Sequence, residues 1–269
     1  MDNFLELNPD HIRQMGDHLV EPSPTLSSMV VYTLVGSALG FQCYNSALNF
    51  VPAPAKYASE KRFKWRNVMT SFVHAIISGS IAVYCYLVWP EIAADMIDFN
   101  NSSMELMVAL SVGYFTYDLL DILYYKEFKA SWSLILHHVV IMSCFSIALY
   151  THKYIGYALF ALIGEVNSIF LHARQLMLMM NYTKSSLSYQ LNGIINVITF
   201  VIFRFGVIFH MSHWLYMHAH LIPTLLIGIG SFGLLAMAII NAVLFKRLLC
   251  SDYLDKRKDL MANGDLLSN

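Results

Sequence analysis

The chain has 269 residues, of which 57% are hydrophobic and 13% are charged. Soluble domains have about 45–50% apolar and about 25% charged residues, so this composition excludes an ordinary soluble fold. The formal net charge is -1, which provides no basic field for nucleic acid, and we therefore expect no nucleic-acid partner.

Seven hydrophobic stretches are long enough to cross a membrane. A hydrocarbon core about 30 Å thick needs roughly 20 apolar residues in a helix. The stretches cover residues 26–50, 68–89, 104–125, 132–150, 154–180, 191–214 and 221–249. We predict an all-α, polytopic transmembrane bundle of about seven spans, in which the inner half of the fifth stretch lies either inside or outside the membrane.

The basic residues predict the orientation of the chain. Of the 17 lysines and arginines, all but three fall on one side of the seven spans; Arg13 and Lys153 lie on the other side, and Arg204 lies within a span. Cytoplasmic loops retain positive charge, so we predict an extracellular N-terminus and a cytoplasmic C-terminus. This places residues 1–25 outside, residues 26–62 in the first span and its basic cytoplasmic loop, and residues 255–269 in a cytoplasmic tail.

Two overlapping N-x-S sequons begin at Asn100 and Asn101, in the loop after the second span. The orientation puts this loop outside, and we expect glycosylation at one of the two asparagines. A further sequon at Asn181 lies on the predicted cytoplasmic side, so we expect it to stay unmodified.

Several ionisable residues fall within the spans at one depth. At about 1.5 Å per residue, His74 in the second span and Asp118 in the third each lie roughly 9 Å from the inner edge. His137 and His138 begin at a similar depth in the fourth span, and Asp121 lies one turn below Asp118. Because charged groups within membranes usually face the bundle interior, this pattern predicts either a functional site or a polar network that holds the spans in register.

The fifth and sixth spans add a second polar group. Glu165, Ser168 and His172 share one helix face, with Asn167 beside them. Arg204 in the sixth span lies at nearly the depth of Glu165, and a buried charge needs a partner. We therefore predict a Glu165–Arg204 ion pair, which is either structural or part of a site for a lipid headgroup.

The histidines do not have the arrangement of an iron-dependent membrane desaturase or hydroxylase. His210, His213, His218 and His220 fall at the outer end of the sixth span and beyond, whereas His74, His137 and His138 lie near the inner side. Imidazoles on opposite membrane faces cannot share an ion. We expect no metal and no cofactor.

Four segments carry a family resemblance: WRNVMTSFVHA from Trp65, SVGYFTYDLLDI from Ser111, ASWSLILHHVV from Ala130 and GEVNSIFLHAR from Gly164. In this order they resemble the TLC-domain family of membrane proteins, and within it the group called TLC domain-containing proteins one and two. The resemblance covers residues 63–254.

The resemblance implies a multi-pass plasma-membrane protein that regulates the fatty-acid composition of phospholipids and hence fluidity, limiting polyunsaturated chains. Its partners would be membrane phospholipids or acyl chains; protein partners remain open. The lipid-contacting residues would come from the interior polar set, which comprises His74, Asp118, Asp121, His137, His138, Glu165, Asn167, His172 and Arg204.

Acyl transfer is the second hypothesis. Ceramide synthases share the domain, and in them a paired histidine and a later His-Asp with a further aspartate are associated with catalysis. His137 and His138 match the pair, and one of them would act as general base, oriented by Asp118, with acyl-CoA as substrate. Gly164-Glu165 and Ser168 stand where the later acidic residues are expected, which disfavours acylation of a sphingoid base.

Overall fold

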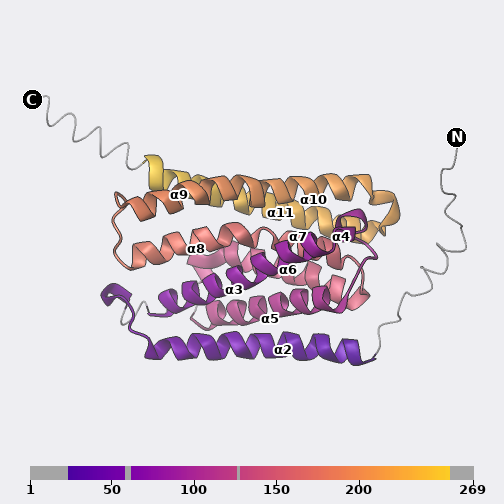
Figure 1. Ribbon diagram of the computed structural model, residues 1–269, viewed down its shortest axis with the longest axis horizontal. Helices are drawn as coiled ribbons and strands as arrows, with labels where there is room; N and C mark the ends of the chain where they lie inside the picture. The colour runs from indigo at the N-terminus through magenta and orange to yellow at the C-terminus, as the bar shows by residue number, and fades with distance from the viewer. Residues whose placement is uncertain (1–23, 58–61, 126–127, 255–269) are drawn as a thin grey trace, which may run out of the picture.

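The computed structural model describes residues 24–57, 62–125 and 128–254 as long helices that lie side by side in a bundle (Figure 1). Residues 1–23 of the predicted extracellular segment, the predicted tail 255–269, and Lys61 and Lys126 of the basic loops lie outside this range. The α-helices are α2 Pro24–Ala47, α3 Arg62–Val88, α4 Glu91–Ala94, α5 Ser102–Tyr124, α6 Phe128–Thr151, α7 Ile155–Leu162, α8 Glu165–Met179, α9 Leu187–Phe200, α10 Gly206–Met217 and α11 Thr224–Leu249. Short 3-10 turns occur at Leu48–Phe50, Ala55–Tyr57 and Ala219–Leu221, and π-helical turns η3 and η5 at Val201–Phe205 and Cys250–Leu254.

Within the described residues, six helical segments are long and apolar enough to cross a membrane. They are Arg62–Val88, Ser102–Tyr124, Trp132–Thr151, Ile155–Met179, Leu187–Met217 and Thr224–Asp252. These segments correspond to the second to seventh predicted spans, and they confirm an all-helical, polytopic architecture. The first predicted span corresponds to α2, which is not among the six; its 24 residues extend about 36 Å.

Two of the predicted spans are interrupted. The fifth is divided into α7 and α8 at Ile163 and Gly164, and the sixth passes through η3 before continuing as α10. A π-helical turn adds a residue to the helix and rotates all that follows, and such turns are frequent at functional sites. Both interruptions adjoin the polar residues described below.

The core of the bundle surrounds α5. In its membrane-spanning window 61% of residues are buried, against 11% for α11, so α5 is central and α11 is peripheral. The residue before the helix, Asn101, caps it: its side chain accepts a hydrogen bond from the Met104 backbone N–H at 3.0 Å. The buried face of α5 includes Val108 and Phe115, against which α2, α3, α6 and α7 pack.

Small residues allow two close helix contacts. A Cβ at Gly113 of α5 would overlap the Leu34 carbonyl and the Ser37 side chain of α2, and Ser37 Oγ donates to the Leu110 carbonyl at 2.6 Å. A Cβ at Gly79 of α3 would lie 2.9 Å from the backbone nitrogen of Val166 in α8. Membrane helices associate through such close approach because lipid provides little hydrophobic drive between them.

One end of the bundle is closed around Glu105, which is fully buried. His152 Nδ1 lies 2.8 Å from Glu105 Oε1, and Asn100 Nδ2 donates to the same oxygen. On the exposed rim Lys153 pairs with Asp98 at 2.7 Å, and this hydrogen bond raises the pKa of the Lys153 ammonium. These contacts tie the α6–α7 connection to the loop before α5.

The opposite end is closed around Arg174 of α8. Its guanidinium donates to both carboxylate oxygens of Asp252 in η5, with Nε–Oδ2 at 2.6 Å. Tyr189 of α9 donates to Asp252 at 2.8 Å, and Lys184 donates to the Ser251 carbonyl at 2.7 Å. We call these residues the inner clasp, after the side of the membrane on which the sequence predicts them; the clasp joins α8 and α9 to the end of α11.

Candidate functional site

A polar cavity of about 250 Å³ lies between α3, α5, α6, α8, η3 and α11. Six of the predicted interior residues line it: His74, Asp118, His137, Glu165, His172 and Arg204. These side chains come from different helices and were grouped in the sequence by their depth along each helix. In the structure they line the same cavity. Asp121 is not among the residues that line this cavity, and its Oδ2 is buried without a hydrogen-bond partner.

The two adjacent histidines of α6 have different surroundings. His137 lines the cavity, whereas His138 is buried and its Nδ1 lies 3.5 Å from Asp118 Oδ2. Asn67 of α3 donates to the other oxygen of Asp118 at 2.6 Å. Neighbouring residues on a helix point about 100° apart, which accounts for the division. The expectation that Asp118 orients a histidine therefore applies to His138 and not to the cavity-facing His137.

His74 is held by aromatic contacts. Its ring stacks on that of Tyr114 with centroids 3.7 Å apart, and its Nε2 lies 3.4 Å from Ser111 Oγ. Phe41 of α2 packs edge-on against both rings. Over the described ranges, no three histidine, cysteine or acidic side chains are grouped closely enough to hold a metal ion.

Arg204 is held by neutral groups on α8 and α11. Its Nε donates to Asn167 Oδ1 at 2.8 Å, its Nη2 to Ser168 Oγ at 2.8 Å and its Nη1 to Asn241 Oδ1 at 2.7 Å. The predicted ion pair with Glu165 is wrong: no carboxylate of the described chain lies within 4.0 Å of this guanidinium. Three neutral oxygens thus accept hydrogen bonds from the guanidinium, and Glu165 lines the same cavities as Arg204 without forming an ion pair with it.

The asparagines near Arg204 join helices. Asn167 Nδ2 donates to Asn196 Oδ1 at 2.9 Å, and Asn192 Nδ2 donates to the Phe170 carbonyl at 3.1 Å. These bonds hold α9 against α8, so Asn192 and Asn196 act as interhelical contacts. The Asn167 oxygen remains available to orient Arg204.

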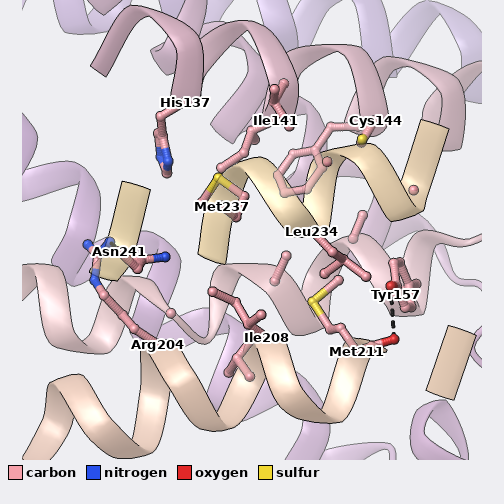
Figure 2. Close-up of a pocket in the computed structure, with 18 of the residues that line it drawn as sticks. His137, Ile141, Cys144, Tyr157, Arg204, Ile208, Met211, Leu234, Met237 and Asn241 are labelled. Atoms are coloured by element: carbon pink, nitrogen blue, oxygen red, sulfur yellow. Dashed lines mark hydrogen bonds between the residues drawn. The ribbon is translucent and has the colours of Figure 1, made fainter. Parts of the chain in front are cut away.

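A second cavity, of about 140 Å³, extends from the polar one between α6, α7, α10 and α11 (Figure 2). Figure 2 shows His137, Arg204 and Asn241 at one end and the hydrogen bond from Tyr157 to the Met211 carbonyl, 3.1 Å long, at the other. The wall between these ends is apolar and includes Ile141, Cys144, Ile208, Leu234 and Met237.

The two cavities meet at His137, Glu165 and Arg204, which line both. We call the two cavities together the chamber: its polar part holds the ionisable side chains, and its apolar part leads away from them. A molecule with a polar group and a hydrocarbon tail matches this division.

The family of the chain follows from comparison with known proteins. The family model for the TLC domain matches residues 64–250. The chain belongs to the TLC domain family. TLC domain-containing protein 2 of Danio rerio is 40% identical to it over 235 residues, which are 87% of this chain and 94% of that protein. TLC domain-containing protein 2 of Homo sapiens is 33% identical over 221 residues, 82% of this chain and 83% of that protein.

TLC domain-containing protein 1 of Homo sapiens is 30% identical over 234 residues, covering 86% of this chain and 93% of that protein. No solved structure matches the chain. The TLC domain contains every residue that lines the chamber, whereas α2 precedes it and Asp252 of the inner clasp follows it.

Sequence reasoning missed several residues of the TLC domain site. Asn67 and Asn241 position Asp118 and Arg204, and Tyr157 lies at the far end of the apolar cavity. Asn67 could have been predicted from the sequence, because it falls on the same helix as His74 within one of the segments that resemble the family. Asn241 and Tyr157 could not, because their contacts depend on helix rotation.

Proposed function

We propose that this protein regulates the fatty-acid composition of phospholipids in the plasma membrane, and hence membrane fluidity, by binding a lipid in the chamber. In this role it limits polyunsaturated acyl chains. The observation that carries the proposal is the junction of a polar and an apolar cavity. His137, Glu165 and Arg204 line both cavities at this junction.

A purely structural network explains the junction poorly. A network that only holds helices in register has its polar groups paired with one another, as the side-chain amides of Asn167 and Asn192 are. Glu165 instead lines open space and makes no hydrogen bond or ion pair with any described residue, and His172 Nδ1 is buried without a partner. Unsatisfied ionisable groups inside a membrane are costly, and a bound polar group would offset that cost.

The arrangement of the helices supports the proposed topology. The C-terminal ends of α2, α5 and α8 lie at the end of the bundle to which the C-terminal end of α11 points, and α2 begins at the opposite end (Figure 1). The first end carries the basic loops, so the positive-inside rule makes it cytoplasmic. We propose α2 as an additional crossing, which gives seven spans, and we propose that the polar cavity, which Arg247 lines, lies toward the inner leaflet.

The same orientation exposes the Asn100 and Asn101 sequons on the outer side. A glycan is attached to the side-chain nitrogen of asparagine, and that atom of Asn100 donates to buried Glu105. Asn101 uses its oxygen for the α5 cap, which leaves its nitrogen free. We therefore propose Asn101 as the glycosylated residue.

Acyl transfer is the second candidate, because His137 is open to both cavities. As a general base it would accept the proton of a lipid hydroxyl while the oxygen bonds to the acyl carbon of acyl-CoA and the CoA thiolate leaves with that proton. The contact of Asp118 with His138 rather than His137 removes the orienting carboxylate from this scheme.

A reconstituted assay separates the two candidates. Protein in liposomes would be supplied with acyl-CoA and a lysophospholipid, alongside lipidomics of cells that lack the protein. The regulator predicts altered acyl composition in the cells and no turnover by the purified protein. Turnover that His137→Ala abolishes and His213→Ala retains would establish the enzyme instead; His213 is an exposed histidine at the outer end of α10. Unchanged lipidomes would reject the proposed regulation.

A further inference from the structure

The cation at the junction of the chamber, Arg204, has no carboxylate of the described residues within 4.0 Å. Each of the three guanidinium nitrogens of Arg204 donates one hydrogen bond. The acceptors are Asn167, Ser168 and Asn241, all of which are neutral. A guanidinium has five N–H groups, so two remain. Since Arg204 lines both cavities, its charge is fixed in position and accessible from the chamber.

The positions of these partners make Arg204 rigid. Asn167 and Ser168 lie at the start of α8, directly after the break from α7, and Asn241 lies on α11. The π-helical turn η3 carries Arg204 between them. A pre-organised fork of this kind recognises a carboxylate through two parallel charge-assisted hydrogen bonds.

The apolar cavity is too small for two acyl chains side by side. Its volume is about 140 Å³, and an engineered apolar cavity of about 150 Å³ holds one benzene molecule. It therefore holds a segment of a single hydrocarbon chain. A further apolar cavity of about 80 Å³ shares Cys144, Ala148, Tyr154, Tyr157 and Gly230 with it and extends the path toward Trp214. Arg204 and Trp214 are ten residues apart, or about 15 Å along a helix.

Two glycines of α11 keep the apolar path open. A Cβ at Gly233 would lie 3.3 Å from Val140 and 3.6 Å from Cys144 on α6, and a Cβ at Gly230 would lie 3.4 Å from Leu215 on α10. A larger side chain at either position would enter the space between these helices. Gly228 of the same helix has nothing within 4 Å of its Cβ position, so it faces away from the path.

The geometry points to a long-chain fatty acid as the ligand, with its carboxylate on Arg204 and the part of its single tail next to the carboxylate in the apolar cavities. This inference rests on the proposed function and gives the lipid a chemical class. It explains why the polar and apolar parts of the chamber meet at an unpaired guanidinium. Glu165 lines the same junction, and its negative charge repels the carboxylate of the ligand. It therefore lowers the affinity for the fatty acid.

The test uses the full-length protein purified in detergent, with radiolabelled oleate as the probe. We expect saturable binding of one oleate per chain and competition by methyl oleate that is at least tenfold weaker, because the ester cannot form the ionic pair. Equal competition by oleate and methyl oleate would overturn the assignment of Arg204. If a lysophospholipid or oleoyl-CoA competes more strongly than unlabelled oleate, the ligand is that lipid and the assignment to a fatty acid is wrong.

Variants test the two ends of the site separately. We expect Arg204→Gln to lower oleate affinity at least tenfold, and Gly233→Leu to abolish binding while Gly228→Leu retains it. If Arg204→Gln fails to fold, Glu165→Gln tests the carboxylate position instead. This variant should raise the affinity for oleate and leave the affinity for methyl oleate unchanged. Equal oleate binding by both glycine variants would contradict the tail position.

The inference and the proposed function fail in different ways. A lipidome that shifts on deletion, in cells whose purified protein binds no oleate, rejects the fatty acid and retains the regulation. Oleate binding with an unchanged lipidome rejects the regulation and retains the binding site.

Discussion

At the scale of single residues, the interior of the bundle divides its ionisable groups into two kinds. Asp118 and His138 are buried and lie against each other, and Asp118 accepts a hydrogen bond from Asn67, which is the pattern of a packed polar network. Glu165 and Arg204 border open space and do not pair. Burial alone therefore does not identify a binding site; the distinguishing feature is an ionisable group that borders a cavity and forms no ion pair there.

Asp118 provides a test of the buried network. Asp118→Ala removes the acceptor of the Asn67 amide and leaves buried polar groups unsatisfied, so we expect a loss of about 1–3 kcal/mol in the free energy of unfolding. Asp118→Asn retains an oxygen for Asn67 and should lose less. Thermal unfolding in detergent measures both; equal losses would show that the Asn67 contact contributes nothing.

At the scale of helices, small residues and charged contacts at the ends determine how elements pack. The α2–α5 interface depends on Gly113, and the end of α11 depends on the inner clasp. The two contacts lie on different sides of the bundle and share no residue, so their effects on stability should add.

The α2–α5 interface is tested by a pair of glycine substitutions. Gly113→Leu places a side chain where the Leu34 carbonyl and Ser37 lie, and overpacking of this kind costs about 1–3 kcal/mol. Gly36→Leu on the exposed face of α2 meets nothing within 4 Å and should leave stability within about 0.5 kcal/mol of wild type. Chemical denaturation in mild detergent compares them; a Gly36→Leu loss as large as that of Gly113→Leu would contradict this packing.

The inner clasp is tested by hydrogen exchange at the end of α11. Arg174→Ala or Asp252→Ala leaves the partner charge buried, and breaking a buried pair costs about 3–5 kcal/mol. We expect faster amide exchange over residues 246–252 in each variant. The double variant should exchange no faster than either single variant, because both remove the same contact; additive effects would show that the two residues act independently.

The sequence allowed the depth of residues to be predicted but not their direction. The rise per residue is constant along a helix, so His74, Asp118 and His137 could be placed at one level from numbering alone. The rotation of each helix depends on packing, and the π-helical turn before α10 and the break before α8 shift it further. This is why a Glu165–Arg204 ion pair was predicted although the two side chains only line the same cavities, and why Asn241 was missed.

At the scale of the whole molecule, the alternation of helix direction makes the two ends chemically different. One end carries the basic loops and the inner clasp, and the other carries buried Glu105 and the sequons. The chamber begins near the first end and extends toward the second.

The proposed topology is tested with tags at the two termini in intact cells. Seven spans predict that an N-terminal epitope is labelled by an impermeant antibody, whereas a C-terminal epitope is labelled only after permeabilisation. Asn101→Gln should also remove the shift in electrophoretic mobility that a glycosidase produces, and Asn181→Gln should not. Labelling of both termini from the same side would reject the crossing by α2.

The central claim is that the chamber holds a lipid between α6, α7, α10 and α11. A cryo-electron microscopy map of the protein in lipid nanodiscs tests it most directly. We predict elongated density whose polar end lies within hydrogen-bonding distance of Arg204 and whose tail passes Gly233 toward Tyr157. Cavities that are empty or filled by side chains, with Glu165 moved into an ion pair with Arg204, would contradict the account.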